Sequence, residues 1–83
     1  MDQKLVNLFV PALQQSFDLI VPTSVSIEIL TGWLTKCVHE LSEGKYIISG
    51  QEKLCTKNPD VLLKENQTLA ECCIINGTHL VLF

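Results

Sequence analysis

The chain contains no arginine and little charge of either sign. Its 83 residues include six lysines against nine acidic residues, which gives a net charge of −3 and a pI near 5.1. Arginine supplies the planar fork that suits phosphates and guanine bases, so its absence argues against nucleic-acid binding. Charged residues make up 18% of the chain and apolar residues 47%, a balance that is typical of a folded protein and unlike that of a disordered one.

Long apolar runs are also missing. The first apolar stretch, Leu5 to Val10, is short and ends at Pro11, so we expect neither a secretory signal peptide nor a membrane-spanning helix. Direct membrane insertion is therefore not expected, and a reducing cytoplasm with free thiols is the predicted location. A chain of this length has enough residues for one core, so residues 1–83 are expected to form a single domain.

The four cysteines and two histidines show no pattern that is typical of a metal site. No C-x-x-C pair occurs, and the neighbouring side chains of Cys72 and Cys73 should point apart, so we predict no bound metal. A nucleophilic thiol, either Cys55 or Cys73 near His79, lacks a visible third residue to orient the pair, and so small a domain leaves little room for a cleft. We therefore expect no catalytic residues and no cofactor.

Five strands are predicted by apolar alternation. Residues 4–10 and 16–21 alternate with period two and lie close enough in sequence to form a hairpin. Residues 53–57 and 61–64 predict two shorter strands on either side of a turn at 58–60, and the chain ends in a fifth strand. The side chains expected to face the core are Val6, Leu8, Val10, Phe17, Leu19, Val21, Leu54, Leu80 and Leu82.

One amphipathic helix is predicted from about residue 26 to residue 41. Ser24 or Ser26 can cap its start, and Gly44 can close its end in a left-handed conformation. Gly32 in the middle weakens the helix by about 1 kcal/mol relative to alanine, and no compensating reason is visible in the sequence. The residues at steps of three and four that predict the core-facing stripe are Ile27, Leu30, Leu34, Cys37, Val38 and Leu41.

The order of these elements indicates an α+β fold in which a sheet packs on one main helix. The first and last strands are the most apolar, so we expect them side by side at the centre of the sheet. Their pairing should be parallel, because a crossover longer than a helix separates them. The path of residues 44–53 does not follow from the pattern.

At this point the chain resembles the ubiquitin-like β-grasp family over nearly its whole length. The resemblance is carried by Val21-x₅-Ile27-x₂-Leu30-x₃-Leu34 and by Thr68-Leu69-x₂-Cys72-x-Ile74-x₂-Gly77-x₂-Leu80-x-Leu82. Within that fold the chain is most similar to the small bacterial YukD/EsaB branch, which accompanies type VII (WXG100) secretion systems, through residues 18–22, residues 61–66 and the Ile74-x₂-Gly77 turn. The resemblance implies a five-stranded mixed sheet packed on one α-helix.

The chain departs from that family in ways that bear on function. Cys72 stands where such folds often place a tyrosine that braces the preceding loop, and a thiol is a weak hydrogen-bond donor. Residues 44–53 form a longer segment than in ubiquitin. The diglycine tail of conjugated modifiers is absent after Phe83, so we expect a protein that is not conjugated to others.

Two groups of apolar side chains are candidate protein-binding residues. His79, Val81 and Phe83 form a strip on the sheet face opposite the helix. We expect equally that this strip is a surface for a partner and that it consists of apolar side chains exposed without a function. The resemblance supports the first reading, because ubiquitin-like folds typically bind through this face. Ile29 and Trp33 lie one helical turn apart, outside the core stripe. Trp33 either anchors a partner or packs over the sheet edge or against the loop after Gly44. Packing is favoured because a small core usually needs its one tryptophan.

The sequence thus predicts a cytoplasmic, non-conjugated ubiquitin-like adaptor or regulatory component of a type VII secretion system. Its expected partner is a protein of that system, and its expected state is a monomer or a weak homodimer. One alternative is a structural domain that associates with itself through sheet edges or through Trp33. Another is a small thiol enzyme or sulfur carrier, although sulfur carriers use the tail chemistry that this chain lacks.

Overall fold

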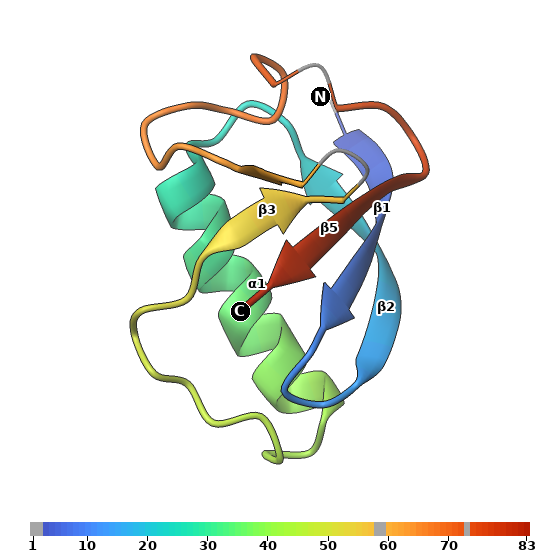
Figure 1. Cartoon of the computed structure of the whole chain (residues 1–83), viewed down its shortest axis with the longest axis vertical. Helices are drawn as coiled ribbons and strands as arrows, with labels where there is room; N and C mark the ends of the chain where they lie inside the picture. Colours follow the sequence, from blue (N-terminus) through green and yellow to red (C-terminus); the bar gives the residue numbers. More distant parts are fainter. Residues whose placement is uncertain (1–2, 58–59, 73) are drawn as a thin grey trace.

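The computed structural model of the protein describes residues 3–57, 60–72 and 74–83. Its elements in chain order are β1 (Gln3–Val10), β2 (Gln15–Pro22), α1 (Ile27–Leu41), β3 (Leu54–Thr56), β4 (Val61–Leu62) and β5 (Thr78–Leu82). The strands form one mixed sheet in the order β2-β1-β5-β3-β4, and α1 crosses one face of it (Figure 1). The predicted α+β architecture is confirmed.

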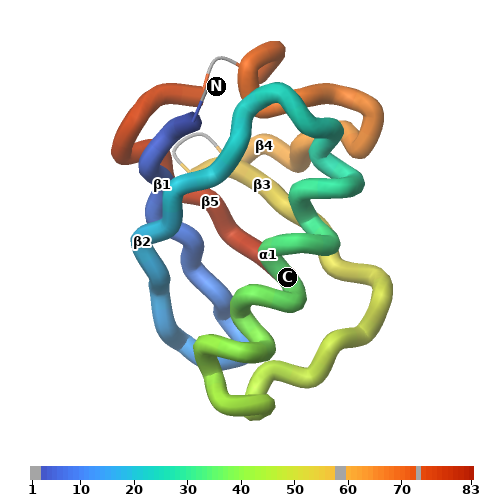
Figure 2. The backbone as a smooth tube through the Cα atoms, turned by 180° about the vertical axis from the view of Figure 1, so that it is seen from behind, coloured from blue at the N-terminus to red at the C-terminus, as the bar shows by residue number. Residues whose placement is uncertain are grey.

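The centre of the sheet is the parallel pair of β1 and β5. Leu8 lies opposite Leu80 in this pair, and β1 forms an antiparallel hairpin with β2 on its other side. On the far side of β5, strand β3 runs antiparallel and pairs in turn with β4. The chain therefore places its first and last strands together, as predicted, and the view from behind shows α1 lying across them (Figure 2).

A single hydrophobic core fills the space between the sheet and α1. The inward residues of β1 and β5 have no exposed surface, and Tyr46, Leu69 and Ile74 close the core from the connecting segments. The prediction for the helix stripe is wrong at its C-terminal end, because Cys37 is only partly buried and Leu41 is 50% exposed. Periodicity assigns a residue to a helix face but does not tell whether the last turn is covered, and α1 ends at Leu41.

Both ends of α1 show the expected caps. The Ser26 hydroxyl accepts a hydrogen bond from the backbone N–H of Ile29 at 3.3 Å, which selects Ser26 over Ser24. At the other end Gly44 has a φ of 83°, and its N–H donates to the carbonyl of His39 at 2.9 Å. The left-handed closure predicted at Gly44 is confirmed.

The segment between α1 and β3 runs beside the helix without forming a helix or strand (Figures 1 and 2). It is organised by Glu52, whose Oε2 accepts hydrogen bonds from Tyr46 Oη at 3.1 Å and from the Ser49 N–H and Oγ at 2.7 and 3.0 Å. Its Oε1 accepts from the Gly50 N–H at 3.0 Å. Beyond it, β3 and β4 are shorter than predicted, and residues 58–59 of the expected turn lie outside the described residues.

Thr68 and Glu71 close a turn that precedes β5. The Thr68 hydroxyl accepts from the Glu71 N–H at 3.2 Å, while Glu71 Oε1 accepts from the Thr68 N–H at 3.0 Å, which makes a reciprocal capping box. Cys72 packs against the core, and its thiol lies 3.7 Å from Gln67 Oε1. This weak contact and packing take the place of the stronger brace that a tyrosine hydroxyl could provide.

Candidate protein-docking site

The face of the sheet opposite α1, called the outer face below, carries a line of apolar side chains across four strands. In the register of the sheet, Phe9 lies opposite Val81, Val81 opposite Cys55, and Cys55 opposite Leu62. Partners in register point to the same side, and the alternate residues Leu8, Leu80 and Leu54 are buried beneath them. The line is therefore presented outward, and Leu62 at its end is 59% exposed.

Polar side chains beside this line bond to one another. The ring Nδ1 of His79 lies 3.2 Å from Asn7 Oδ1, and Asn7 Nδ2 donates to Asp18 Oδ1 at 3.0 Å. These three residues form a chain across β5, β1 and β2, which fixes the orientation of the His79 ring. A partner that covers the neighbouring apolar line would leave this hydrogen-bonded chain intact.

The strip His79, Val81 and Phe83 lies together on the outer face, as the sequence predicted. Phe83 continues the pairing beyond β5, because its backbone exchanges two hydrogen bonds with Lys53, and its side chain is 56% exposed. We call this strip, together with Phe9 and Leu62 of the same face, the outer-face patch: Phe9, Leu62, His79, Val81 and Phe83. Sequence reasoning missed Phe9 and Leu62, although the alternation in β1 together with the parallel pairing would have placed Phe9 beside Val81.

The structure does not bring the helix candidates to this patch. Ile29 and Trp33 lie in α1, on the other side of the sheet from the outer face (Figure 1). The expectation that the core needs Trp33 is wrong, because this side chain is 51% exposed and is not among the residues packed on the core. The core is filled by aliphatic residues and Tyr46 without it. Ile29 and Trp33 thus form a separate apolar surface.

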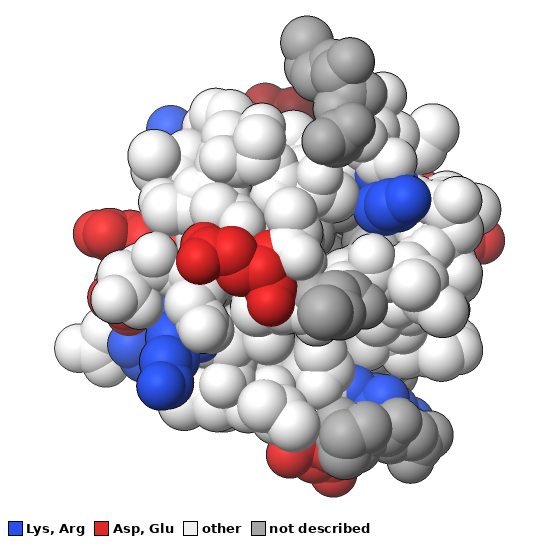
Figure 3. All heavy atoms as spheres, turned by 90° about the horizontal axis from the view of Figure 1, so that it is seen from above, with Lys and Arg blue, Asp and Glu red and all other residues white. Residues whose placement is uncertain are grey.

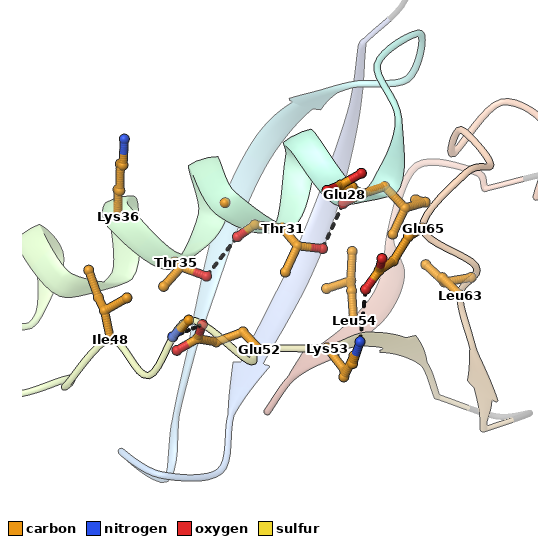
Figure 4. Close-up of a pocket in the computed structure, with 13 residues that line it drawn as sticks. Glu28, Thr31, Thr35, Lys36, Ile48, Glu52, Lys53, Leu54, Leu63 and Glu65 are labelled. Carbon is orange, nitrogen blue, oxygen red and sulfur yellow. Dashed lines mark hydrogen bonds and ion pairs between the residues drawn. The ribbon is translucent and has the colours of Figure 1, made fainter.

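A groove lies between α1 and the segment that carries Glu52, Lys53 and Leu54 (Figure 4). Its volume is about 300 Å³. Its apolar lining comes from Ile27 of α1, from Ile48 and Leu54 on the segment leading into β3, and from Leu63 after β4. The Lys53 ammonium lies 2.8 Å from Glu65 Oε1 across one end of it. This groove could not be predicted from the sequence, because its lining comes from residues 27–36, 48–54 and 63–65, whose spatial arrangement is set by the fold.

Among the described thiols, Cys55 has an environment that disfavours the thiolate. Cys37, Cys55 and Cys72 form no disulfide within the described residues, and Cys73 lies outside them. Burial, together with the nearby Asp60 carboxylate, raises the pKa of the Cys55 thiol above its ordinary value, whereas a nucleophilic thiol at neutral pH needs a lowered pKa. Within residues 3–57, 60–72 and 74–83, no group of three His, Cys, Asp or Glu side chains is placed to hold a metal ion.

Comparison with known families gives a match over nearly the whole chain. The family model described as "WXG100 protein secretion system (Wss), protein YukD" matches residues 5–82. The chain belongs to the YukD family. The resemblance drawn from the sequence motifs is therefore confirmed, and the domain is a ubiquitin-like domain of a family associated with type VII secretion. A search of curated proteins finds no match to this YukD-family chain.

Solved structures share the fold of the YukD-family chain at low sequence identity. The ubiquitin-like domain of the Mycobacterium tuberculosis type VII secretion system protein ECCD1 has a TM-score of 0.78 at 19% identity, over 99% of this chain and 98% of that one. The EccD5 ubiquitin-like domain of Mycobacterium xenopi has a TM-score of 0.82 at 16% identity, over 100% and 94%. These likenesses show a common fold.

A related domain also occurs within a large assembly. A chain of the MycP5-free ESX-5 inner membrane complex matches with a TM-score of 0.81 at 19% identity, over 100% of the YukD-family chain and 21% of that chain. That domain is thus one part of a longer protein inside a multi-protein complex. In the part of the YukD-family chain that the structure describes, no helix is both long and apolar enough to cross a membrane.

Proposed function

We propose that this YukD-family protein is a cytoplasmic, non-conjugated adaptor or regulatory component of a type VII secretion system. It acts without catalysis, by reversible docking of the outer-face patch on a protein component of that system. Membership of the YukD family supports the link to secretion. The observation that carries the docking mechanism is the outward line from Phe9 through Val81 to Leu62, which lies beside polar groups that already bond to one another.

The chemistry of the patch suits a protein partner. The Lys57 ammonium lies 5.8 Å from the centre of the Phe9 ring, so a cation stands beside the apolar line. The view from above, which looks onto the end of the molecule and not onto the outer face, shows lysine and acidic side chains dispersed among uncharged residues (Figure 3). An apolar centre with a polar rim is the usual anatomy of a protein interface, whereas nucleic acid requires a gathered basic surface.

The test is recovery of a partner from native host extract by crosslinking to the tagged full chain. The wild-type chain should recover a secretion-system component, and Leu62→Asp or Val81→Asp should reduce its recovery about tenfold or more, as expected for residues central to an interface. Ile47→Asp is the matched control, because Ile47 is 77% exposed and lies away from the patch. Circular dichroism checks that each variant is folded.

The proposal fails if no secretion component is recovered, or if both patch variants recover it as well as the control does. Leu62→Asp makes this result decisive, since Leu62 is already largely exposed and an aspartate there should not disturb the core. Val81 is partly buried, so its variant tests the centre of the patch at a greater risk to stability.

A second candidate, self-association as a weak homodimer, is favoured by the helix surface. Ile29 and Trp33 are each about half exposed and lie one turn apart on α1, so together they present an apolar ridge. Trp33 is the one tryptophan of the chain, so its fluorescence reports on this surface directly. A concentration-dependent blue shift that Ile29→Asp abolishes would support the dimer, and a constant spectrum with monomeric light scattering would exclude it.

A further inference from the structure

The turn that leads into β5 contains the one Asn-Gly dipeptide of the chain, Asn76-Gly77. In such a pair the backbone nitrogen of the glycine can attack the side-chain amide of the asparagine, because no Cβ on the glycine shields that nitrogen. The reaction, called deamidation, converts the amide into an acid. Both residues are exposed at the surface, so exposure alone would leave this dipeptide reactive.

Both reacting groups are held by one residue of β1. The side-chain oxygen Oδ1 of Asn76 accepts a hydrogen bond from the Leu5 N–H at 2.9 Å, and the Gly77 N–H donates to the Leu5 carbonyl at 2.8 Å. The nitrogen that would have to lose its proton and attack is thus occupied as a donor. Together these two bonds extend the parallel pairing of β1 with β5 toward the start of β1 (Figure 1).

The turn itself also opposes the reaction. The Thr78 N–H donates to the Ile75 carbonyl at 3.2 Å, which closes a turn with the dipeptide at its centre. Gly77 has a φ of 88° whereas the φ of Asn76 is not positive, which identifies a type II turn. Ring closure requires the Gly77 nitrogen to eclipse the Asn76 Cβ, and in a type II turn the two are far from eclipsed. The Thr78 hydroxyl fixes this turn, because it accepts from the Ile75 N–H at 3.1 Å and donates to the Ile75 carbonyl at 2.7 Å.

We propose that Asn76 is a site of deamidation that becomes reactive only when β1 and β5 separate. In the opened chain the Gly77 nitrogen bonds to the side-chain carbon Cγ of Asn76. The bond from Cγ to the amide nitrogen breaks, and that nitrogen leaves as ammonia with the proton from the Gly77 N–H. Water then opens the succinimide ring at either of its carbonyls, which gives aspartate or isoaspartate. Water is the one co-reactant, so the site does not depend on the proposed docking function.

The two products differ in their effect on the sheet. Aspartate keeps a side-chain oxygen that can accept from the Leu5 N–H, so the pairing can form again. Isoaspartate carries the main chain through the former side-chain carbon and adds one backbone atom just before β5. The added atom displaces the register in which Val6 lies opposite Thr78. A chain that has once opened is therefore marked covalently, and its isoaspartate form rebuilds the central pair less well.

Opening of this site is tied to the stability of the whole fold. β1 and β5 lie side by side at the centre of the sheet, and Leu8 and Leu80, which face each other there, have no exposed surface. Core strands open with a free energy close to that of global unfolding. The folded protein should therefore present the reactive geometry in about one molecule in 10³ or fewer.

The test follows deamidation of the full chain by peptide mass spectrometry, at one mildly alkaline pH, in buffer and in guanidinium chloride that unfolds the protein. Asn76 should react in the unfolded chain and at least about 100-fold more slowly in the folded chain. Asn66 is the internal control, because Gln67 follows it and shields the attacking nitrogen. Equal rates at Asn66 and Asn76 in guanidinium would overturn the site. A smaller difference between folded and unfolded chains would overturn its protection by the fold.

Matched variants at Leu5 test the protecting contact. Leu5→Pro removes the N–H that bonds to Asn76 but no bond to β2, because both backbone groups of Leu5 point toward β5. Leu5→Val keeps the N–H and serves as the control. In the folded state Leu5→Pro should deamidate about tenfold faster than Leu5→Val, and in guanidinium the two should react equally. Equal rates in the folded state would overturn the role of Leu5.

A second pair of variants covers the case in which circular dichroism shows that Leu5→Pro does not fold. Thr78→Val removes the hydroxyl that fixes the turn, whereas Thr78→Ser retains a hydroxyl. Deamidation of the folded protein should be faster in Thr78→Val than in Thr78→Ser, and equal rates would contradict the protection by the turn. Chromatography then separates the two products. Asn76→Asp should unfold at nearly the urea concentration of the wild type, and the refolded isoaspartate form at a lower one. Equal midpoints for the isoaspartate form and the wild type would refute the displaced register.

Discussion

Replacing Glu52 by glutamine tests how the segment between α1 and β3 is held in place. One carboxylate oxygen accepts hydrogen bonds from Tyr46 and twice from Ser49, and the other accepts from Gly50. Glutamine keeps the shape and can keep the three contacts of one oxygen. Its NH₂ group cannot accept from the Gly50 N–H, and the negative charge that strengthens every contact is lost.

The magnitude follows from the strength of hydrogen bonds to charged groups. Such bonds contribute about 1.5–3 kcal/mol each in buried sites, compared with about 0.5–1.5 kcal/mol for neutral ones. The segment is largely exposed, so solvent screening reduces the difference substantially. We expect Glu52→Gln to lower the free energy of unfolding by about 1 kcal/mol at pH 7, which corresponds to a fall in Tm of about 4 to 8 °C.

The pH dependence gives the sharper signature. Burial alone would raise the pKa of Glu52, but hydrogen bonds from Ser49, from its own backbone and from Tyr46 outweigh it and lower the pKa below the ordinary value of 4.5. A lowered pKa in the folded state means that the carboxylate stabilises the protein above pH 4.5. This stabilisation is lost as the pH falls through the folded-state value.

The assay is urea unfolding followed by circular dichroism, for the wild type and Glu52→Gln at pH 7 and at successively lower pH. The difference between the two proteins should be present at pH 7 and shrink below about pH 4.5. Glu40→Gln is the control, because Glu40 is an exposed helical residue and its variant should differ by less than about 0.5 kcal/mol. Equal stability at pH 7, or a difference that persists undiminished in acid, would refute the reasoning.

Two further predictions concern the core and the thiols. Leu80→Ala should lower the free energy of unfolding, measured by urea denaturation, by about 2–5 kcal/mol, because Leu80 is fully buried in the central strand β5. Val81→Ala on the outer face should lower it clearly less. Equal losses of stability would contradict the faces assigned to the two residues. A variant that retains Cys55 as its one cysteine should react with iodoacetamide more slowly than free cysteine at pH 8, because burial and Asp60 raise the pKa of this thiol. A faster reaction would instead support the alternative that the protein is a thiol enzyme.

Sequence pattern predicted the elements that make the core. The alternation in residues 4–10 and the helical spacing from Ile27 to Val38 each reflect one buried face, so burial could be inferred from period alone. The parallel pairing of the first and last strands followed from their apolar character and from the long connection between them. The family resemblance rested on the order and spacing of these same residues, and the match over residues 5–82 confirms it.

Features set by the ends of elements or by several segments together did not follow from the pattern. Leu41 has the right spacing for the core but lies at the last helical residue, and Trp33 was expected to be needed for a core that closes without it. The groove beside Gly32 depends on where residues 48–54 run, which no period specifies. The outer-face strip was predicted, but its neighbours Phe9 and Leu62 became evident only with the register of the sheet.

The parallel pair at the centre of the sheet has a consequence for how the protein is made. Asn7 and His79 are neighbours in space but 72 positions apart in sequence. A nascent chain therefore exposes the hairpin and the apolar side of the helix until β5 has been synthesised. Contacts this distant in sequence slow folding. We expect fragments that lack β5 to aggregate, because the apolar faces of β1 and α1 then stay uncovered.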